Sequence, residues 1–121
     1  MKTGMIVLRL TLVTGWVVLL GITLHAVAER GLIEAPYVFL GDLTHPWRAQ
    51  FNTDFSLNLL LIAAWVVYRA RSWRLGLVWG FLTLMMGALF TLPYLLVVTL
   101  RAHGDMRVVL LGRHYSPRGP R

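Results

Sequence analysis

The feature that most constrains this chain is an uncharged run of 26 residues, Leu75 to Leu100, which Arg74 and Arg101 close at its two ends. A helix needs about 20 apolar residues to cross the hydrocarbon core of a bilayer. The run is longer than that, so it predicts a membrane-spanning helix over residues 75–100. We therefore interpret the chain as an integral membrane protein.

The composition agrees with a membrane location. Hydrophobic residues make up 57% of the 121 residues and charged residues 14%, whereas soluble domains carry about 25% charged residues. The net charge of +7 comes from 12 Lys and Arg, most of them beside apolar segments. Anionic lipid head groups explain these cations, so we expect no nucleic-acid partner. The absence of cysteine excludes disulfides, thiolate catalysis and Cys-type zinc sites.

A second apolar segment lies near the N-terminus. It is uncharged from residue 10 to residue 28 and follows Lys2 and Arg9, which predicts a helix over about residues 8–28. A small-x-small motif at 26–28 also imitates a signal-peptide cleavage site. The apolar stretch is long for a signal peptide, and we expect an uncleaved anchor helix.

A third helix is predicted over residues 46–68, after a connection that is rich in acidic residues and helix breakers. Pro46 is favoured at the first position of a helix. Asp54 then lies about 12 Å along the axis, where head groups give way to acyl chains. Asn58 follows one turn later on the same face.

The helices at 46–68 and 75–100 are expected to form a tight antiparallel hairpin, because the turn between them is short. Small residues four apart permit close helix contact in lipid. Pro93 is expected to kink the last turns of the second helix. The residues predicted to form the packing surface are Gly76, Gly80, Thr83, Gly87 and Thr91.

These segments give an all-α transmembrane domain over residues 1–101, with three spanning helices, and a basic C-terminal tail over 102–121. Residues 116–121 are expected to be disordered in isolation. The positive-inside rule favours an orientation with the N-terminus and the turn at residues 69–74 in the cytoplasm. With three spans this orientation places the basic tail outside, contrary to the same rule. The inverted orientation, with the tail inside and the turn outside, therefore stays open. The arginines expected to contact lipid or a partner are Arg69, Arg71, Arg74, Arg101, Arg107 and Arg113.

Asp54 is the residue most suggestive of function, because a carboxylate within the hydrocarbon is costly unless it is paired or neutral. It is either a proton-relay acid or ligand anchor, or an interfacial acid that pairs with Arg48 or His25. We expect Asp54, Asn58 and His25 to be buried polar groups.

His25 lies at the membrane level predicted for Asp54. It either ligates a haem or pigment or donates a hydrogen bond to a neighbouring helix. The other histidines, His45, His103 and His114, have no metal-ligand spacing. We predict no metal site and no bound cofactor.

Residues 46–101 resemble a group of small bacterial three-helix membrane proteins of unknown function. The long connection before residue 46 and the extended basic tail depart from that group. The resemblance implies the three-helix arrangement and no particular activity. The matching residues are Asp54, Trp65, Arg69, Arg71, Gly87, Pro93, Tyr94, Leu95, Leu96 and Arg101.

No phosphate-binding glycine loop, nucleophile elbow or zinc-protease helix occurs in the sequence. We therefore predict a non-catalytic accessory subunit of a larger complex in a bacterial inner membrane, for example a photosynthetic or respiratory one, which it binds through helix faces and the basic tail. The alternative is a small homo-oligomeric transport or proton-handling protein that uses Asp54, Asn58 and His25. An enzyme that acts on lipid or quinone has no supporting motif.

Overall fold

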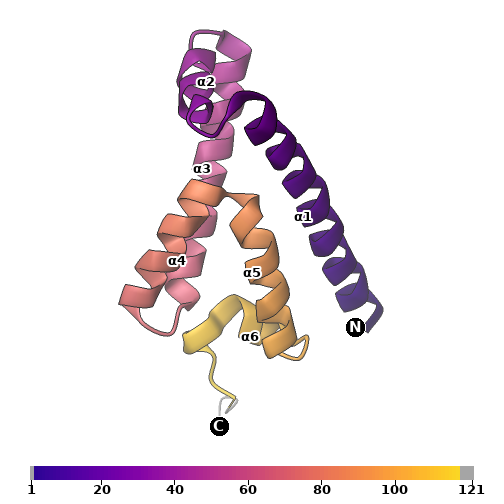
Figure 1. The fold of residues 1–121 in the computed structure, drawn as a ribbon. Helices are drawn as coiled ribbons and strands as arrows, with labels where there is room; N and C mark the ends of the chain where they lie inside the picture. Colours follow the sequence, from indigo (N-terminus) through magenta and orange to yellow (C-terminus); the bar gives the residue numbers. More distant parts are fainter. Residues whose placement is uncertain (1, 118–121) are drawn as a thin grey trace.

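A computed structural model describes residues 2–117, and within them the chain is all-α, as predicted (Figure 1). Most of the segment expected to be disordered, residues 118–121, lies outside the described residues. The elements are α1 (Lys2–Arg30), α2 (Glu34–Asp42), α3 (Pro46–Arg69), α4 (Trp73–Met86), α5 (Ala88–Arg101), α6 (Met106–Leu111) and the 3-10 helix η1 (Gly112–His114).

Two of these helices, α1 and α3, are long and apolar enough to cross a membrane, and α1 also fits the pattern of a signal sequence. With 29 and 24 residues, they measure about 43 and 36 Å. The helix α3 begins at Pro46 as predicted, where the His45 side chain accepts a hydrogen bond from the Arg48 N–H. The helix α1 begins at Lys2 rather than near residue 8, because nothing in residues 2–7 stops a helix.

The segment 75–100 is not one helix, and this prediction is wrong. The helix is interrupted at Gly87, which has a φ of 57° and a ψ of −133°. Glycine adopts this backbone conformation far more readily than other residues. Two helices of 14 residues result: α4 runs to the middle of the molecule, and α5 returns to the end from which α4 started (Figure 1). The expected kink at Pro93 is not where the direction changes, since Pro93 lies inside α5.

The helices α3 and α4 pack closely because α4 presents glycine to α3. A Cβ atom on Gly76 would lie 3.1 Å from the Val67 carbonyl oxygen and 3.2 Å from the Ala70 Cβ. A Cβ atom on Gly80 would lie 2.9 Å from the Val67 Cγ2. Thr83 is fully buried on the same side of α4, so small side chains set the spacing of this hairpin.

The helix α1 packs antiparallel along α5. The Trp16 Nε1 donates to the Leu89 carbonyl at 3.1 Å, and the Arg9 Nη2 donates to the Thr99 carbonyl at 3.0 Å. Trp16 lies near the middle of α1, so the turn at Gly87 lies beside the midpoint of that helix.

One end of the molecule, which we call the basic end, gathers the start of α1, the α3–α4 turn, the end of α5, α6 and η1 (Figure 1). Residues 106–114 of the predicted tail are helical and pack on α3 and α5. Buried Val98, Ala102 and Val109 form a small core there. The described cations of this end are Lys2, Arg9, Arg69, Arg71, Arg74, Arg101, Arg107 and Arg113, and its described acid is Asp105.

Candidate functional site

The Arg69 side chain, in the last turn of α3, connects α3 to α5 and α6 at the basic end. Its Nε donates to the Val109 carbonyl at 2.8 Å, and its Nη1 donates to the Tyr94 hydroxyl at 2.8 Å. The guanidinium also lies 5.8 Å from the Trp65 ring centroid and 5.7 Å from that of Tyr94. The Trp65 Nε1 in turn donates to the Leu110 carbonyl at 3.1 Å. These contacts give Arg69 a structural role within the chain, and its predicted contact with lipid or a partner stays a prediction.

A groove of about 730 Å³ extends from this arginine between α4 and α5, and we call it the arginine groove. Stacked aromatic rings form part of its wall: Trp79 and Phe90 have centroids 5.8 Å apart, and Phe90 and Tyr94 5.4 Å apart. The lining residues are Arg69, Ala70, Arg71, Leu75, Trp79, Phe90, Pro93, Tyr94, Val97, Val98, Arg101, Ala102, Val108, Gly112 and Arg113.

The charge of the groove is entirely positive among these lining residues, which include four arginines and no acid. The side chains of Arg71 and Arg101 are exposed, and neither forms a hydrogen bond or ion pair with another residue that the structure describes. The Arg113 Nε donates to the neighbouring His114 Nε2 at 3.3 Å. The groove therefore combines guanidinium groups available to an anion with an apolar wall.

The other two predicted contact arginines lie outside the groove. The Arg74 guanidinium lies 5.5 Å from the centroid of the Trp73 ring. Arg107 pairs with Asp105 at 3.2 Å. The hydrogen bond from the Arg107 side chain is the main cause that lowers the pKa of the Asp105 carboxyl. The same interaction raises the pKa of Arg107. Asp105 also caps α6 by accepting from the Arg107 N–H.

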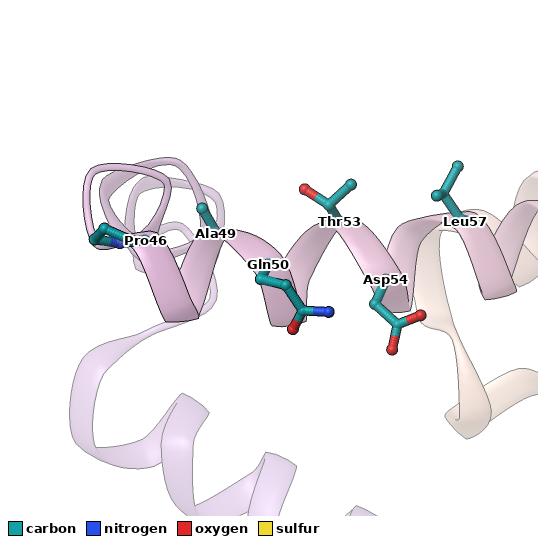
Figure 2. A pocket seen from close by; sticks show the side chains of 6 residues that line it. All are labelled: Pro46, Ala49, Gln50, Thr53, Asp54 and Leu57. Atoms are coloured by element: carbon teal, nitrogen blue, oxygen red, sulfur yellow. The ribbon is translucent and has the colours of Figure 1, made fainter.

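Asp54 is exposed on α3, in a stripe of polar residues spaced by four that we call the polar face: Gln50, Asp54 and Asn58. Figure 2 shows the shallow depression beside it, whose lining residues all belong to α3. The Asn58 Nδ2 donates to the Asp54 Oδ1 at 3.2 Å and to the Asp54 carbonyl at 3.0 Å. The polar face is a surface of one helix and not an enclosed pocket.

The prediction that Asp54, Asn58 and His25 are buried is wrong for a single copy of the chain, since all three are exposed. Arg48 pairs with Asp42 at 3.1 Å rather than with Asp54. His25 lies on α1 and forms no hydrogen bond with Asp54. Neither of the two partners expected for Asp54, Arg48 and His25, therefore pairs with it. The sequence spacing predicts how deep each side chain lies along its helix, but it does not predict toward which neighbouring helix the side chain points.

Within residues 2–117, no group of three His, Cys, Asp or Glu side chains is placed to hold a metal ion. His114 instead stacks on Tyr68 at a centroid separation of 4.1 Å. The arginine groove was not predicted from the sequence. The signal that could have found it is the position of Gly87, which divides the 75–100 run into two halves flanked by arginine at their outer ends.

The model of a family of proteins of unknown function, DUF1475, matches residues 3–115. No curated protein and no solved structure matches the chain. The family match extends well beyond the resemblance at residues 46–101. It includes α1, α2 and α6, so the long connection and the folded part of the tail are features that the family model also covers.

Proposed function

The chain belongs to the DUF1475 family, and from its own structure we propose that it is a non-catalytic accessory subunit of a larger complex in a bacterial inner membrane. It engages its partner through the polar face of α3. The proposal combines the placement of the chain in the bilayer with the polar face of α3, which contacts no other helix within residues 2–117 through an ion pair.

Membrane placement is supported by the exposure of the long helices. Only 6% of the most apolar 18-residue window of α1 and 11% of that of α3 is buried inside the chain. The core helix of a soluble protein would hide such residues, since exposed apolar surface costs about 25 cal/mol per Å² in water. A bilayer removes this cost.

In this membrane, α4 and α5 form a hairpin that enters and leaves on the same side. Each has 14 residues, or about 21 Å, which is too short to cross a hydrocarbon core of about 30 Å. The irregular backbone at Gly87 is buried in protein, as a break at membrane depth must be. We therefore propose two spans, α1 and α3, with a half-crossing hairpin in place of a third span.

The charges support a cytoplasmic basic end. Eight described cations and one described acid lie at that end, while the opposite half carries two cations, Arg30 and Arg48, and four acids. The positive-inside rule places the first group in the cytoplasm. The half-crossing hairpin also removes the conflict that three spans created, because the turn at residues 70–72 and the C-terminal segment now share one side.

The observation that carries the partner proposal is the exposure of Asp54 and its polar neighbours on a spanning helix. Asp54 lies about 12 Å from the start of α3, and both it and Asn58 are exposed in the single chain. Polar and ionisable groups at this depth normally face protein rather than lipid. A hydrogen-bonding helix of another membrane protein would satisfy them.

The test is extraction of a tagged chain from its native membrane in mild detergent, followed by native electrophoresis and mass spectrometry. We expect stoichiometric migration with a larger complex, and loss of that association in the double variant Asp54→Leu, Asn58→Leu. The matched control is Ile22→Ala, an exposed residue of α1, which should stay associated.

Migration of the wild-type chain as a small homo-oligomer would overturn the accessory-subunit proposal in favour of the transport or proton-handling alternative. In that case Asp54→Asn should abolish activity and leave the oligomer intact. Association of the double variant with the complex at the wild-type level would instead exclude the polar face as the interface.

A further inference from the structure

The arginine groove has two chemically distinct parts, arranged along the axis of the hairpin. We propose that it binds one anionic phospholipid of the surrounding bilayer, with the phosphate at Arg71, Arg101 and Arg113 and an acyl chain along the wall between α4 and α5. This inference rests on the proposed membrane placement and is independent of the proposed partner at the polar face of α3.

The arginines lie where lipid phosphates would be. Arg71 precedes α4 and Arg101 ends α5, so both mark the level at which the hairpin enters and leaves the membrane. Guanidinium groups bind phosphate oxygens through paired, charge-assisted hydrogen bonds. The side chains of Arg71 and Arg101 have no hydrogen-bonding partner within residues 2–117, so a phosphate would not have to displace one.

The apolar wall continues from this level toward the middle of the membrane. On α4, Trp79 lies eight residues beyond Arg71, and on α5, Phe90 lies eleven residues before Arg101. Counted from Trp73, where α4 begins, and to Arg101, where α5 ends, the two rings lie about 9 and 16 Å along their helices. A groove with guanidinium groups at its mouth and aromatic rings along its depth matches the order of groups in a phospholipid, and a free inorganic phosphate would leave the wall unused.

The lining also favours an anionic head group over a zwitterionic one. Choline and ethanolamine head groups carry a cation beside the phosphate, and the described lining contains no carboxylate to accept it. Asp105, the described acid of the basic end, is already paired with Arg107. Phosphatidylglycerol should therefore bind in preference to phosphatidylcholine with the same acyl chains.

Arg69 positions the wall instead of binding the phosphate. Its guanidinium already donates to the Tyr94 hydroxyl and to the Val109 carbonyl. This holds the Tyr94 ring in the groove, stacked on Phe90. Arg69 is for that reason left unchanged in the test.

The experiment is native mass spectrometry of the purified full-length chain with phosphatidylglycerol or phosphatidylcholine of matched acyl chains. We expect one retained phosphatidylglycerol and little phosphatidylcholine. The variant Arg71→Gln, Arg101→Gln should bind phosphatidylglycerol about tenfold more weakly. The variant Arg74→Gln, Arg107→Gln removes the same charge from the same end but outside the groove, and it should bind like the wild type.

Two further variants separate a specific site from a general charge effect. Val97→Trp fills the wall without changing the charge, and it should also weaken retention. Arg71→Lys, Arg101→Lys keeps the charge and should restore part of the binding, which a misfolded double variant would not allow. Circular dichroism checks that each variant keeps its helix content.

Three results would overturn the proposal. Equal retention of the two lipids, or equal loss in the two double Gln variants, would indicate attraction to the charged end alone. Displacement of the lipid by millimolar inorganic phosphate would reduce the groove to an anion site. Full binding by Val97→Trp would exclude the wall as the acyl-chain site.

Discussion

At the scale of single residues, Arg69 has an unusual position for a cation at the end of an apolar helix. The sequence suggests a side chain that extends toward lipid head groups, but its guanidinium is turned inward onto the Val109 carbonyl and the Tyr94 hydroxyl. It thereby joins α3, α5 and α6. Arg71, two residues later, is exposed and joins nothing within the described chain.

This difference predicts unequal costs for two similar substitutions. Hydrogen bonds to charged groups contribute about 1.5–3 kcal/mol each, so Arg69→Gln should lower the free energy of unfolding by about 3 kcal/mol. Arg71→Gln should change it by less than about 0.5 kcal/mol. Thermal unfolding in lipid-free detergent measures both. Equal stability of the two variants would show that the Arg69 contacts contribute nothing.

Asp54 illustrates what sequence reasoning cannot supply at this scale. Its depth along α3 follows from the helix rise and the position of Pro46, and its pairing with Asn58 follows from the four-residue spacing. Its direction relative to the other helices depends on which side of α3 receives α4. That choice is made by Val67 and Ala70 facing Gly76 and Gly80.

At the scale of elements, the turn at Gly87 determines the architecture. Hydropathy reports the composition of a segment and not its backbone conformation. Because glycine is common in spanning helices, the presence of Gly87 in the run from residue 75 to residue 100 did not argue against a single helix. The reversal depends on a backbone conformation with φ of 57° and on contacts with α1 and α3 that a single segment does not contain. The two long helices were predictable because α1 follows from the length of its own uncharged run and α3 from its start at Pro46.

We predict that Gly87→Ala destabilises the chain by about 1–3 kcal/mol through backbone strain alone. A Cβ atom at this position would lie 3.7 Å from the Phe55 Cζ, an ordinary contact, so steric overlap adds nothing. The control is Gly21→Ala in α1, where a Cβ atom meets nothing within 4 Å and helix propensity favours alanine by about 1 kcal/mol. Thermal unfolding of both variants checks this, and a neutral Gly87→Ala would contradict it.

At the scale of the whole molecule, the distribution of charge and the path of the chain agree. The start of α1, the turn at 70–72 and the segment after α5 all lie at the basic end (Figure 1), and the α2 region lies at the other. A chain with three full spans would separate Ser72 from Ser116 across the membrane. A chain with a half-crossing hairpin keeps them on one side.

The absence of cysteine makes this topology directly measurable. Single variants Ser72→Cys, Ser116→Cys and Leu43→Cys would be treated in intact cells with a membrane-impermeant maleimide. We expect labelling of the Leu43→Cys chain alone, and labelling of the other two after permeabilisation. Labelling of Ser72→Cys and Ser116→Cys from opposite sides of the membrane would contradict the half-crossing hairpin and would support a third span between these two residues.

The pairing of α1 with α5 has a consequence for how the chain is made. Arg9 and Thr99, which hydrogen-bond to each other, are 90 residues apart in sequence. The acceptor of the Trp16 indole N–H, the Leu89 carbonyl, is likewise synthesised much later than Trp16. In the proposed membrane placement, α1 enters the bilayer before α5 is synthesised, when its Arg9 guanidinium and Trp16 indole N–H still lack their acceptors. The helix α3 receives α4 within a few residues of its own completion. The helix α1 therefore reaches its final packing only after α5 has been synthesised.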